Sequence, residues 1–306
     1  MKRGRRAAVV VPATLPVALA ALCAALLALP GEALAFSDFV GSRGLAMGQA
    51  GRGDARGDQG PLWNPAGMSL ARLYTVEGGY GFITRDGGHA ARVSVVDSTS
   101  ASKLAGGLFY GYRTASPAGV AQLSGHEAGL SLSYPFAEQV LLGVTAKYVN
   151  LSGGFEPDMK GDHSGFTADA GLVVRAGSMV TIGVAGYNLR DLRTVLSPLS
   201  LGYGVALQPT PDLTLVADGY HDFTTSDPLR GTTITVSGGA EYVLQRRMVF
   251  RLGGGRDGGS EHGFLTAGVA ALSELGSLDF GIRQDVSGQA KLTFIAAGVR
   301  LFVPQP

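Results

Sequence analysis

The stretch of residues 139–150 reads Gln139-Val140-Leu141-Leu142-Gly143-Val144-Thr145-Ala146-Lys147-Tyr148-Val149-Asn150. Every second side chain in it forms an apolar row, made of Val140, Leu142, Val144, Ala146 and Tyr148. Successive side chains of a strand point to opposite faces, so this period of two predicts a β-strand with one apolar face. Its length is close to the roughly 9 to 11 residues that a tilted strand needs to cross a bilayer.

The same alternation, bounded by Gly, Pro, Asp and Ser clusters, recurs along the rest of the chain and predicts fourteen strands. Their expected ranges are 73–84, 89–97, 104–112, 126–134, 139–150, 165–175, 180–189, 198–208, 212–222, 231–244, 247–255, 263–271, 275–284 and 291–303. Strands near bilayer-crossing length with one apolar row each are typical of outer-membrane barrels. We therefore predict an all-β fold, a closed antiparallel transmembrane β-barrel of about fourteen strands with a short N-terminal plug.

A barrel in hydrocarbon has no tolerable open edge, so the last strand is expected to pair with the first. The expected turns after even-numbered strands are short, whereas the longer stretches 113–125 and 151–164 follow the third and fifth strands. Short turns on one side and longer loops on the other are the arrangement of outer-membrane barrels. A soluble β-sandwich or barrel gives the same alternation, because periodicity does not say which face meets solvent. The leader, the even strand count and the loop pattern favour the membrane.

Residues 1–35 read as a signal peptide. Basic residues at the start precede an apolar run, which ends in the small-x-small site Ala33-Leu34-Ala35. An uncleaved anchor is the alternative. Cleavage before Phe36 would remove Cys23, the only cysteine, so the mature chain could form no internal disulfide. We expect secretion through the inner membrane, a plug over residues 36–70 and an outer-membrane barrel over residues 71–306.

The charge balance argues against a nucleic-acid partner. The leader holds four of the 25 basic residues and one of the 24 acidic ones, which leaves 21 against 23. The five histidines lack the spacing of metal ligands, so no metal site is expected. We likewise expect no cofactor and no enzymatic activity, because no nucleophile motif is complete. The expected partners are outer-membrane lipid, a hydrophobic small molecule, and secreted or envelope proteins.

The polar rows of the strands carry six acidic and six basic residues, which would face a barrel interior. This balance argues against a pore with a ring of one sign, and it favours pairing of the charges with each other or with the plug. The candidate lumen charges are Asp169, Arg175, Asp218, Arg251, Asp279 and Arg283.

The segment before the strands is too polar and too rich in glycine to bury a core of its own. Its charges alternate at Arg52, Asp54, Arg56 and Asp58, so ion pairs inside a polar lumen could hold it. Its signature is Trp63-Asn64-Pro65-Ala66-Gly67, in which Asn64-Pro65 initiates a turn and proline restricts Asn64 to extended geometry. Asn64, Pro65 and Ala66 are the candidate plug motif.

Two parts of this segment, residues 44–51 and 62–68, resemble the N-terminal signature of the FadL-type outer-membrane transporter superfamily. Residues 166–175, 186–189 and 240–242 resemble its PorV/PorQ-like branch more closely. The resemblance implies a fourteen-stranded barrel with an N-terminal plug. The sequence departs from that of fatty-acid transporters in its shorter mature chain and its small outer loops.

For function, the resemblance implies either a channel for hydrophobic small molecules or, in the PorV-like branch, an export-associated or structural barrel without solute transport. A channel predicts an apolar pocket below the plug and a gap or kink in an early strand. Because glycine in a strand marks bulges, Gly78-Gly79 or Gly106-Gly107 is the expected place. A barrel without transport predicts a sealed lumen and partner contacts through loops 113–125 and 151–164.

Overall fold

The computed structural model describes residues 40–84, 87–99, 103–115, 123–152, 163–192, 197–223, 232–288 and 291–303. They belong to one compact unit, residues 31–306. The predicted signal peptide, the first four residues of the predicted plug and most of loops 113–125 and 151–164 lie outside the described residues. No helix within the described ranges combines the length and the apolarity that crossing a membrane requires.

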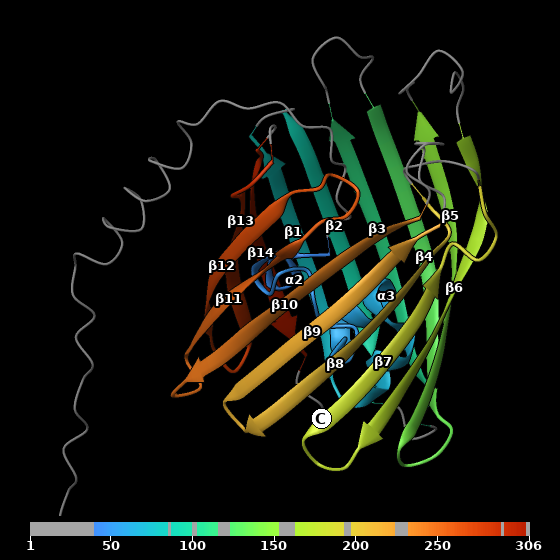
Figure 1. Ribbon diagram of the computed structural model, residues 1–306. Coiled ribbons are helices and arrows are strands. Elements are labelled where there is room, and N and C mark those ends of the chain that lie inside the picture. Colours follow the sequence, from blue (N-terminus) through green and yellow to red (C-terminus); the bar gives the residue numbers. More distant parts are fainter. Residues whose placement is uncertain are drawn as a thin grey trace, which may run out of the picture. The chain divides into compact units, whose positions relative to one another are not determined.

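Fourteen antiparallel strands form a closed barrel in chain order, which confirms the predicted fold class (Figure 1). Every predicted range overlaps one observed strand. The strands are β1 Tyr74–Ile83, β2 Gly88–Asp97, β3 Ala105–Ala115, β4 Leu123–Pro135, β5 Val140–Ser152, β6 His163–Ala176, β7 Val180–Tyr187, β8 Ser200–Thr210, β9 Leu213–Asp222, β10 Thr233–Leu244, β11 Met248–Arg256, β12 Gly263–Leu272, β13 Gly276–Asp285 and β14 Thr293–Phe302.

The first and last strands close the barrel. β1 pairs with β14 without interruption from Thr75 opposite Phe302 to Ile83 opposite Phe294. The closure satisfies the backbone N–H and C=O groups that an open edge would leave unpaired. We call this join the β1–β14 seam.

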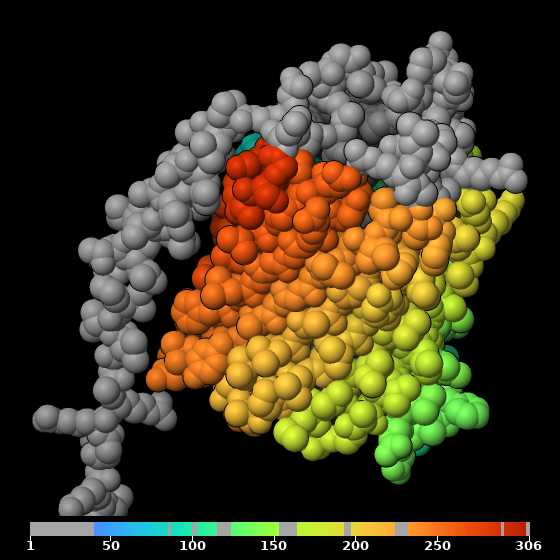
Figure 2. Space-filling model, viewed as in Figure 1, coloured from blue at the N-terminus to red at the C-terminus, as the bar shows by residue number. Residues whose placement is uncertain are grey.

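Side chains alternate between the two faces as the period of two predicts. In β5, Leu142, Val144 and Tyr148 are exposed on the outside, whereas Thr145 and Lys147 are buried inside. The outward rows of β8, β10 and β13 are apolar as well. In Figure 2 the neighbouring strands of β8 to β12, coloured yellow to orange, form a continuous outer surface.

The two rims of the barrel differ in their connections. At the proximal rim, where β1 begins, the turns 136–139, 177–179, 211–212, 245–247 and 273–275 are short. At the distal rim, where β1 ends, the strands β5 and β6 are separated by residues 153–162, and β7 and β8 by residues 188–199. This asymmetry is the one that the sequence predicts.

The N-terminal segment, residues 40–70, lies inside the barrel (Figure 1). It consists of short helices only: α2 Ser42–Ala46, η1 Gly57–Gln59, α3 Gly60–Trp63 and η2 Pro65–Leu70. α2 contacts β11 to β14 and β1, and η2 contacts β3 to β6. Inward-facing glycines let its backbone touch the wall, since a Cβ added at Gly143 would lie 2.2 Å from the backbone nitrogen of Ala66. At Gly239 it would lie 2.4 Å from the carbonyl oxygen of Met47.

Candidate functional site

The barrel wall is thin at the β1–β14 seam. On the outside, Gly78 of β1 lies between Val93 of β2 and Val299 of β14. A Cβ added at Gly78 would meet nothing within 4 Å. In the next residue pair, which faces inward, Gly79 lies opposite Gly298. Neither face of the wall therefore carries a β1 side chain at this level.

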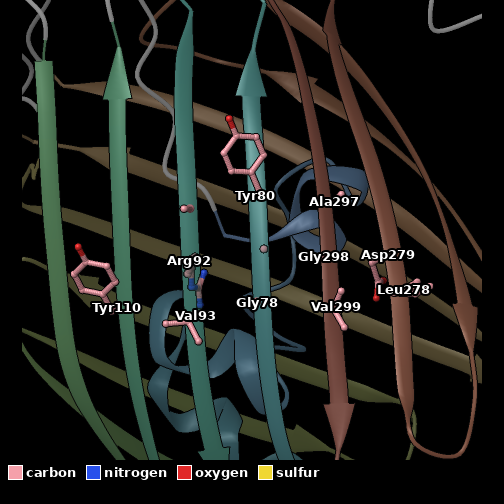
Figure 3. Close-up of a pocket in the computed structure, with 12 residues that line it drawn as sticks. Gly78, Tyr80, Arg92, Val93, Tyr110, Leu278, Asp279, Ala297, Gly298 and Val299 are labelled. Carbon is pink, nitrogen blue, oxygen red and sulfur yellow. The ribbon is translucent and has the colours of Figure 1, made fainter.

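A depression of about 620 Å³ occupies this place (Figure 3). Val93, Val299 and the rings of Tyr80 and Tyr110 surround the position above Gly78 in Figure 3, and no side chain fills it. The lining residues are Gly78, Gly79, Tyr80, Ala91, Arg92, Val93, Tyr110, Leu278, Asp279, Ala297, Gly298 and Val299. Arg92 and Asp279 of this lining belong to the inward rows, and the other lining residues make the depression a largely apolar pocket that opens on the outer face, over the glycine-lined backbone.

The expectation of a bulge at one of the two glycine pairs is wrong. β1 keeps a continuous register with β2 and β14 through Gly78-Gly79, and β2 keeps one with β3 through Gly106-Gly107. In the part of the chain that the structure describes, the recorded shift lies between Leu207 and Thr210 of β8. The glycines thin the wall by omitting side chains, which leaves the ladder intact. Gly106 faces outward over open space, and Gly107 faces Met68 of the N-terminal segment.

The lumen side of the seam is covered by the start of the N-terminal segment. A Cβ added at Gly298 would lie 2.8 Å from Ser42 Oγ, and one added at Gly41 would lie 2.9 Å from Glu77 Oε1. Gly41 has φ of +91°, a conformation that favours glycine. Ser42 Oγ is buried without a hydrogen-bond partner among the described residues. Ser42 is therefore held against the wall by close packing, without a hydrogen bond from its side chain to another described residue.

An apolar cluster adjoins the seam inside the lumen on its distal side. Leu45 of α2 packs there with Ile83 of β1 and with three residues of the β14 region, Leu292, Phe294 and Ala296. All five side chains are buried. A path from the distal mouth toward the seam would therefore run over apolar side chains.

Arg43 anchors α2 beside the seam. Its guanidinium donates to Glu241 at 2.9 Å, to Asp54 at 3.0 Å and to Gln59. Arg251 of β11 shares Glu241 at 2.7 Å and donates to Asp279 at 2.7 Å. Burial by itself would lower the pKa of Arg43, but Glu241 and Asp54 raise it above its ordinary value. The guanidinium therefore stays charged.

Arg52 anchors the middle of the segment to the opposite wall. It donates to Asp218 of β9 at 3.0 Å and to the hydroxyl of Tyr187 at 2.8 Å. Its guanidinium also lies 5.0 Å from the ring centroid of Tyr220, within the range of a cation–π contact. The backbone N–H groups of Gly51 and Arg52 donate to the same carboxylate.

Asp58 connects η1 to the seam strands. Arg300 of β14 donates to its carboxylate at 3.1 Å, and Arg92 of β2 donates to its backbone carbonyl at 3.2 Å. Burial opposes ionisation of Asp58, but Arg300 and a hydrogen bond with Glu77 outweigh it and hold the pKa of Asp58 below its ordinary value. Asp58 therefore joins η1 to β14 and β2, which are far from it and from each other in the sequence.

The plug motif lies at the opposite wall, against β4 to β7. Asn64 is fully buried; its amide donates to the carbonyls of Leu172 at 3.1 Å and Val184 at 3.4 Å, and its oxygen accepts from Ala66 N–H. Pro65 and Ala66 lie against Gly143, where a Cβ would come within 2.3 Å of the Pro65 carbonyl carbon. The motif thus fits a seat made by glycines of the wall.

The remaining candidate lumen charges also have partners. Asp169 pairs with Lys147 at 2.9 Å, and Arg175 donates to the carbonyls of Ser69 and Leu70 at 3.1 Å. Arg283 donates to Asp285 and Gln49, each at 3.1 Å. The structure therefore divides the six candidates among separate anchoring points, and only Arg251 and Asp279 pair with each other.

Sequence reasoning missed Ser42, Tyr187 and Gly298. Their roles depend on which strands meet, and no local pattern in the sequence signals that. Among the described residues, no group of three or more His, Cys, Asp and Glu side chains could hold a metal ion.

No protein-family model and no curated protein sequence matches the chain. Solved structures do resemble it. The toluene transporter TodX of Pseudomonas putida aligns with a TM-score of 0.70 and 14% identity over 89% of this chain and 99% of that one. The toluene transporter TbuX of Ralstonia pickettii aligns with a TM-score of 0.67 and 14% identity over 86% of this chain and 97% of that one. The monoaromatic hydrocarbon channel CymD aligns with a TM-score of 0.67 and 15% identity over 88% of this chain and 99% of that one. At such low identity the likeness establishes the fold.

Proposed function

We propose that this protein is a bacterial outer-membrane channel for hydrophobic small molecules, closed by its N-terminal segment as a plug, with an exit through the wall at the β1–β14 seam. The apolar pocket over Gly78 carries the proposal. It lies on the outer face, where a molecule that leaves the wall would enter lipid, and the plug residue Ser42 covers the same place from inside.

The outward face supports the membrane location. Large apolar side chains are exposed around the barrel, among them Leu108, Leu130, Leu252 and Leu278, each at least half exposed. Such a surface is unfavourable in water and suits acyl chains. The solved structures with the same fold are named as hydrocarbon channels and transporters, which supports a cargo of that class.

A route for the cargo follows from the lumen. The apolar cluster of Leu45, Ile83, Leu292, Phe294 and Ala296 lies between the distal mouth and the seam. Below it the lumen is filled by the charged contacts of the plug, which oppose passage of an apolar molecule to the proximal rim. Displacement of Gly41 and Ser42 would uncover the glycine-lined wall from inside, and passage would then require β1 to separate locally from β14, because the ladder between them is continuous.

Uptake measurements with two matched variants test the proposal. Gly78→Phe fills the outer pocket, whereas Gly106→Phe adds the same side chain at another outward glycine with open space around it. We expect Gly78→Phe to reduce uptake of a labelled fatty acid or aromatic hydrocarbon to background, and Gly106→Phe to leave it unchanged. The assay uses Gram-negative cells that lack other channels of this kind, with equal amounts of folded protein. Equal uptake by the two variants would overturn the lateral exit.

The second candidate function is an export-associated or structural barrel without solute transport, as in the PorV/PorQ-like branch. The observation that favours it is the dense anchoring of the plug by Arg43, Arg52, Asp58 and Asn64. Secreted or envelope proteins would then be its partners. Background uptake by the folded wild-type protein, unchanged when the plug is loosened by Arg43→Met, would favour this function over the channel.

A further inference from the structure

Three tyrosine–histidine pairs lie on the outer face of the barrel near the distal rim. The hydroxyl of Tyr110 bonds Nδ1 of His126 at 2.7 Å, and that of Tyr203 bonds Nε2 of His221 at 3.1 Å. Tyr80 bonds Nδ1 of His89 in the same way. The three tyrosines are 50%, 44% and 42% exposed at positions 80, 110 and 203.

The pairs share one geometry on three different strand pairs. The tyrosine is always on the neighbouring strand, two residues nearer the middle of the barrel than the residue directly opposite the histidine. A second aromatic ring lies beside each histidine, with centroids 5.2 Å away for Phe82, 4.8 Å for Tyr112 and 6.2 Å for Phe223. Each imidazole is therefore held in a fixed orientation.

The hydrogen bond with the tyrosine is linked to whether the other ring nitrogen of the histidine donates or accepts. A neutral histidine that accepts the tyrosine proton at one nitrogen carries its own proton on the other, and a protonated histidine carries a proton on both. In these two states the second nitrogen is a donor; in the other neutral tautomer the histidine donates to the tyrosine oxygen and the second nitrogen is an acceptor. The structure gives that nitrogen no hydrogen-bond partner among the described residues. Three oriented ring nitrogens, which are donors whenever the tyrosine donates or the histidine is protonated, are thus available to an acceptor outside the protein.

The position of these donors indicates the acceptor. Toward the middle of the barrel each pair is followed by exposed apolar side chains, such as Leu108 and Leu130 below Tyr110 and Val205 below Tyr203. A lipid whose acyl chain covers those side chains would place its headgroup at the histidine. The large exposed rings at the proximal rim, Tyr134, Phe136 and Tyr242, have no histidine beside them in the described residues.

We infer that the three tyrosine–histidine pairs bind the phosphate groups of membrane lipids at the distal rim, with the acyl chains against the apolar strips below. The inference rests on the proposed membrane location. Phosphate oxygens accept charge-assisted hydrogen bonds, which are stronger than neutral ones, and they lie at the edge of the hydrocarbon. Two of the pairs lie on the neighbouring hairpins β1–β2 and β3–β4, and the third lies on β8–β9.

Two of the pairs border the pocket over Gly78, because Tyr80 and Tyr110 both line it. Tyr80, which bonds His89, lines the pocket over Gly78 together with Val93. A lipid held by His89 would place an acyl chain in that pocket. Bound lipid would then occupy the proposed exit, and cargo would have to displace it.

Lipid binding by purified protein in detergent tests this inference. Native mass spectrometry with dioleoyl phosphatidic acid and with dioleoylglycerol compares the same chains with and without phosphate. We expect several phosphatidic acids to be retained and dioleoylglycerol to bind about tenfold more weakly, the effect of losing one hydrogen bond to a charged group. The variant His89→Phe/His126→Phe/His221→Phe keeps the rings and should lose this preference.

Controls separate the outcomes. Tyr134→Phe/Tyr242→Phe changes the proximal rim and should keep the preference. Competition by inorganic phosphate at millimolar concentration would identify a free-phosphate site and overturn the lipid assignment, as would equal binding of the two lipids or an unchanged triple histidine variant. Heat-dependent migration on gels verifies folding of each variant. Failure of the channel proposal would appear separately, as background uptake with lipid preference intact.

Discussion

The N-terminal segment is held in different ways at the two walls that it touches. At the seam side the segment also packs on glycines of the wall, and buried charges hold it in addition, with Arg43 bound to Glu241 and Arg300 bound to Asp58. At the β4–β6 side, shape fixes it, because Ala66 fits against Gly143 and Asn64 bonds backbone carbonyls. An ion pair can be removed by replacing one side chain. Close packing of backbone on a wall glycine involves no side chain of the segment that could be removed in the same way. Removal of a single charge is therefore expected to affect the seam end most.

The largest effect is expected from removing the charge at the seam end. Arg43→Met leaves Glu241 and Asp54 without that partner, and breaking a buried pair typically costs about 3 to 5 kcal/mol. We expect a cysteine placed at Ser42 to become reactive toward a maleimide, while one at Ala66 stays protected. The described residues contain no other cysteine, since Cys23 is the only one in the chain.

Arg56→Met is the matched control for that experiment. Arg56 also pairs with Asp54, but its side chain is 39% exposed, so its loss should cost less than about 1 kcal/mol. Labelling at position 42 should then stay at the wild-type rate. If Arg56→Met and Arg43→Met release the segment equally, charge is not what holds the seam end.

A smaller effect is expected from adding a side chain at Gly143, where Ala66 packs against the wall. Gly143→Val places a Cβ at 2.2 Å from the Ala66 backbone, and overpacking of this kind costs about 3 kcal/mol or less where the neighbours can shift. Labelling should now rise at position 66 and stay low at position 42. Gly78→Val adds the same side chain over open space and should change neither rate. Opposite labelling patterns in Arg43→Met and Gly143→Val would establish that the two ends detach independently.

The smallest effect is expected from acid. The pKa of Asp58 lies below its ordinary value because Arg300 favours the carboxylate, with Glu77 and Arg92 as the other ionisable neighbours. A lowered pKa adds stability that is present above the unfolded value of about 3.9 and is lost as the pH falls through the folded pKa. Labelling at position 42 should therefore stay constant from pH 7 to about 4 and rise only below that. A labelling reagent that works in acid, such as a disulfide of pyridine, suits this measurement.

Replacing Arg300 sharpens the acid test. In Arg300→Met the carboxylate loses its main favourable partner while its burial remains, so the pKa of Asp58 should rise and the onset of labelling should move to higher pH. An unchanged onset would mean that another group controls the seam end.

Sequence reasoning reached the fold because its signal is local. Alternation in each strand follows from the geometry of one strand, and the short turns lie between neighbours in the chain. It also placed the candidate charges on the inward rows, since a polar residue in a polar row must face the lumen, and it singled out Asn64, Pro65 and Ala66 from the Asn-Pro turn signal and the family resemblance. It did not find the seat of Ala66 on Gly143, because nearly 80 residues separate the two.

The number of strands, their order and the face that each side chain takes follow from the amino-acid sequence, since these depend on periodicity and chain connectivity. The pairing of Gly78 and Gly79 in the first strand with Val299 and Gly298 in the last became visible only in the folded barrel. The same holds for the contact of Tyr80 with His89 and that of Arg43 with Glu241. The reason is physical: barrel closure and strand register bring distant residues together, and a shift of one residue would reverse every face.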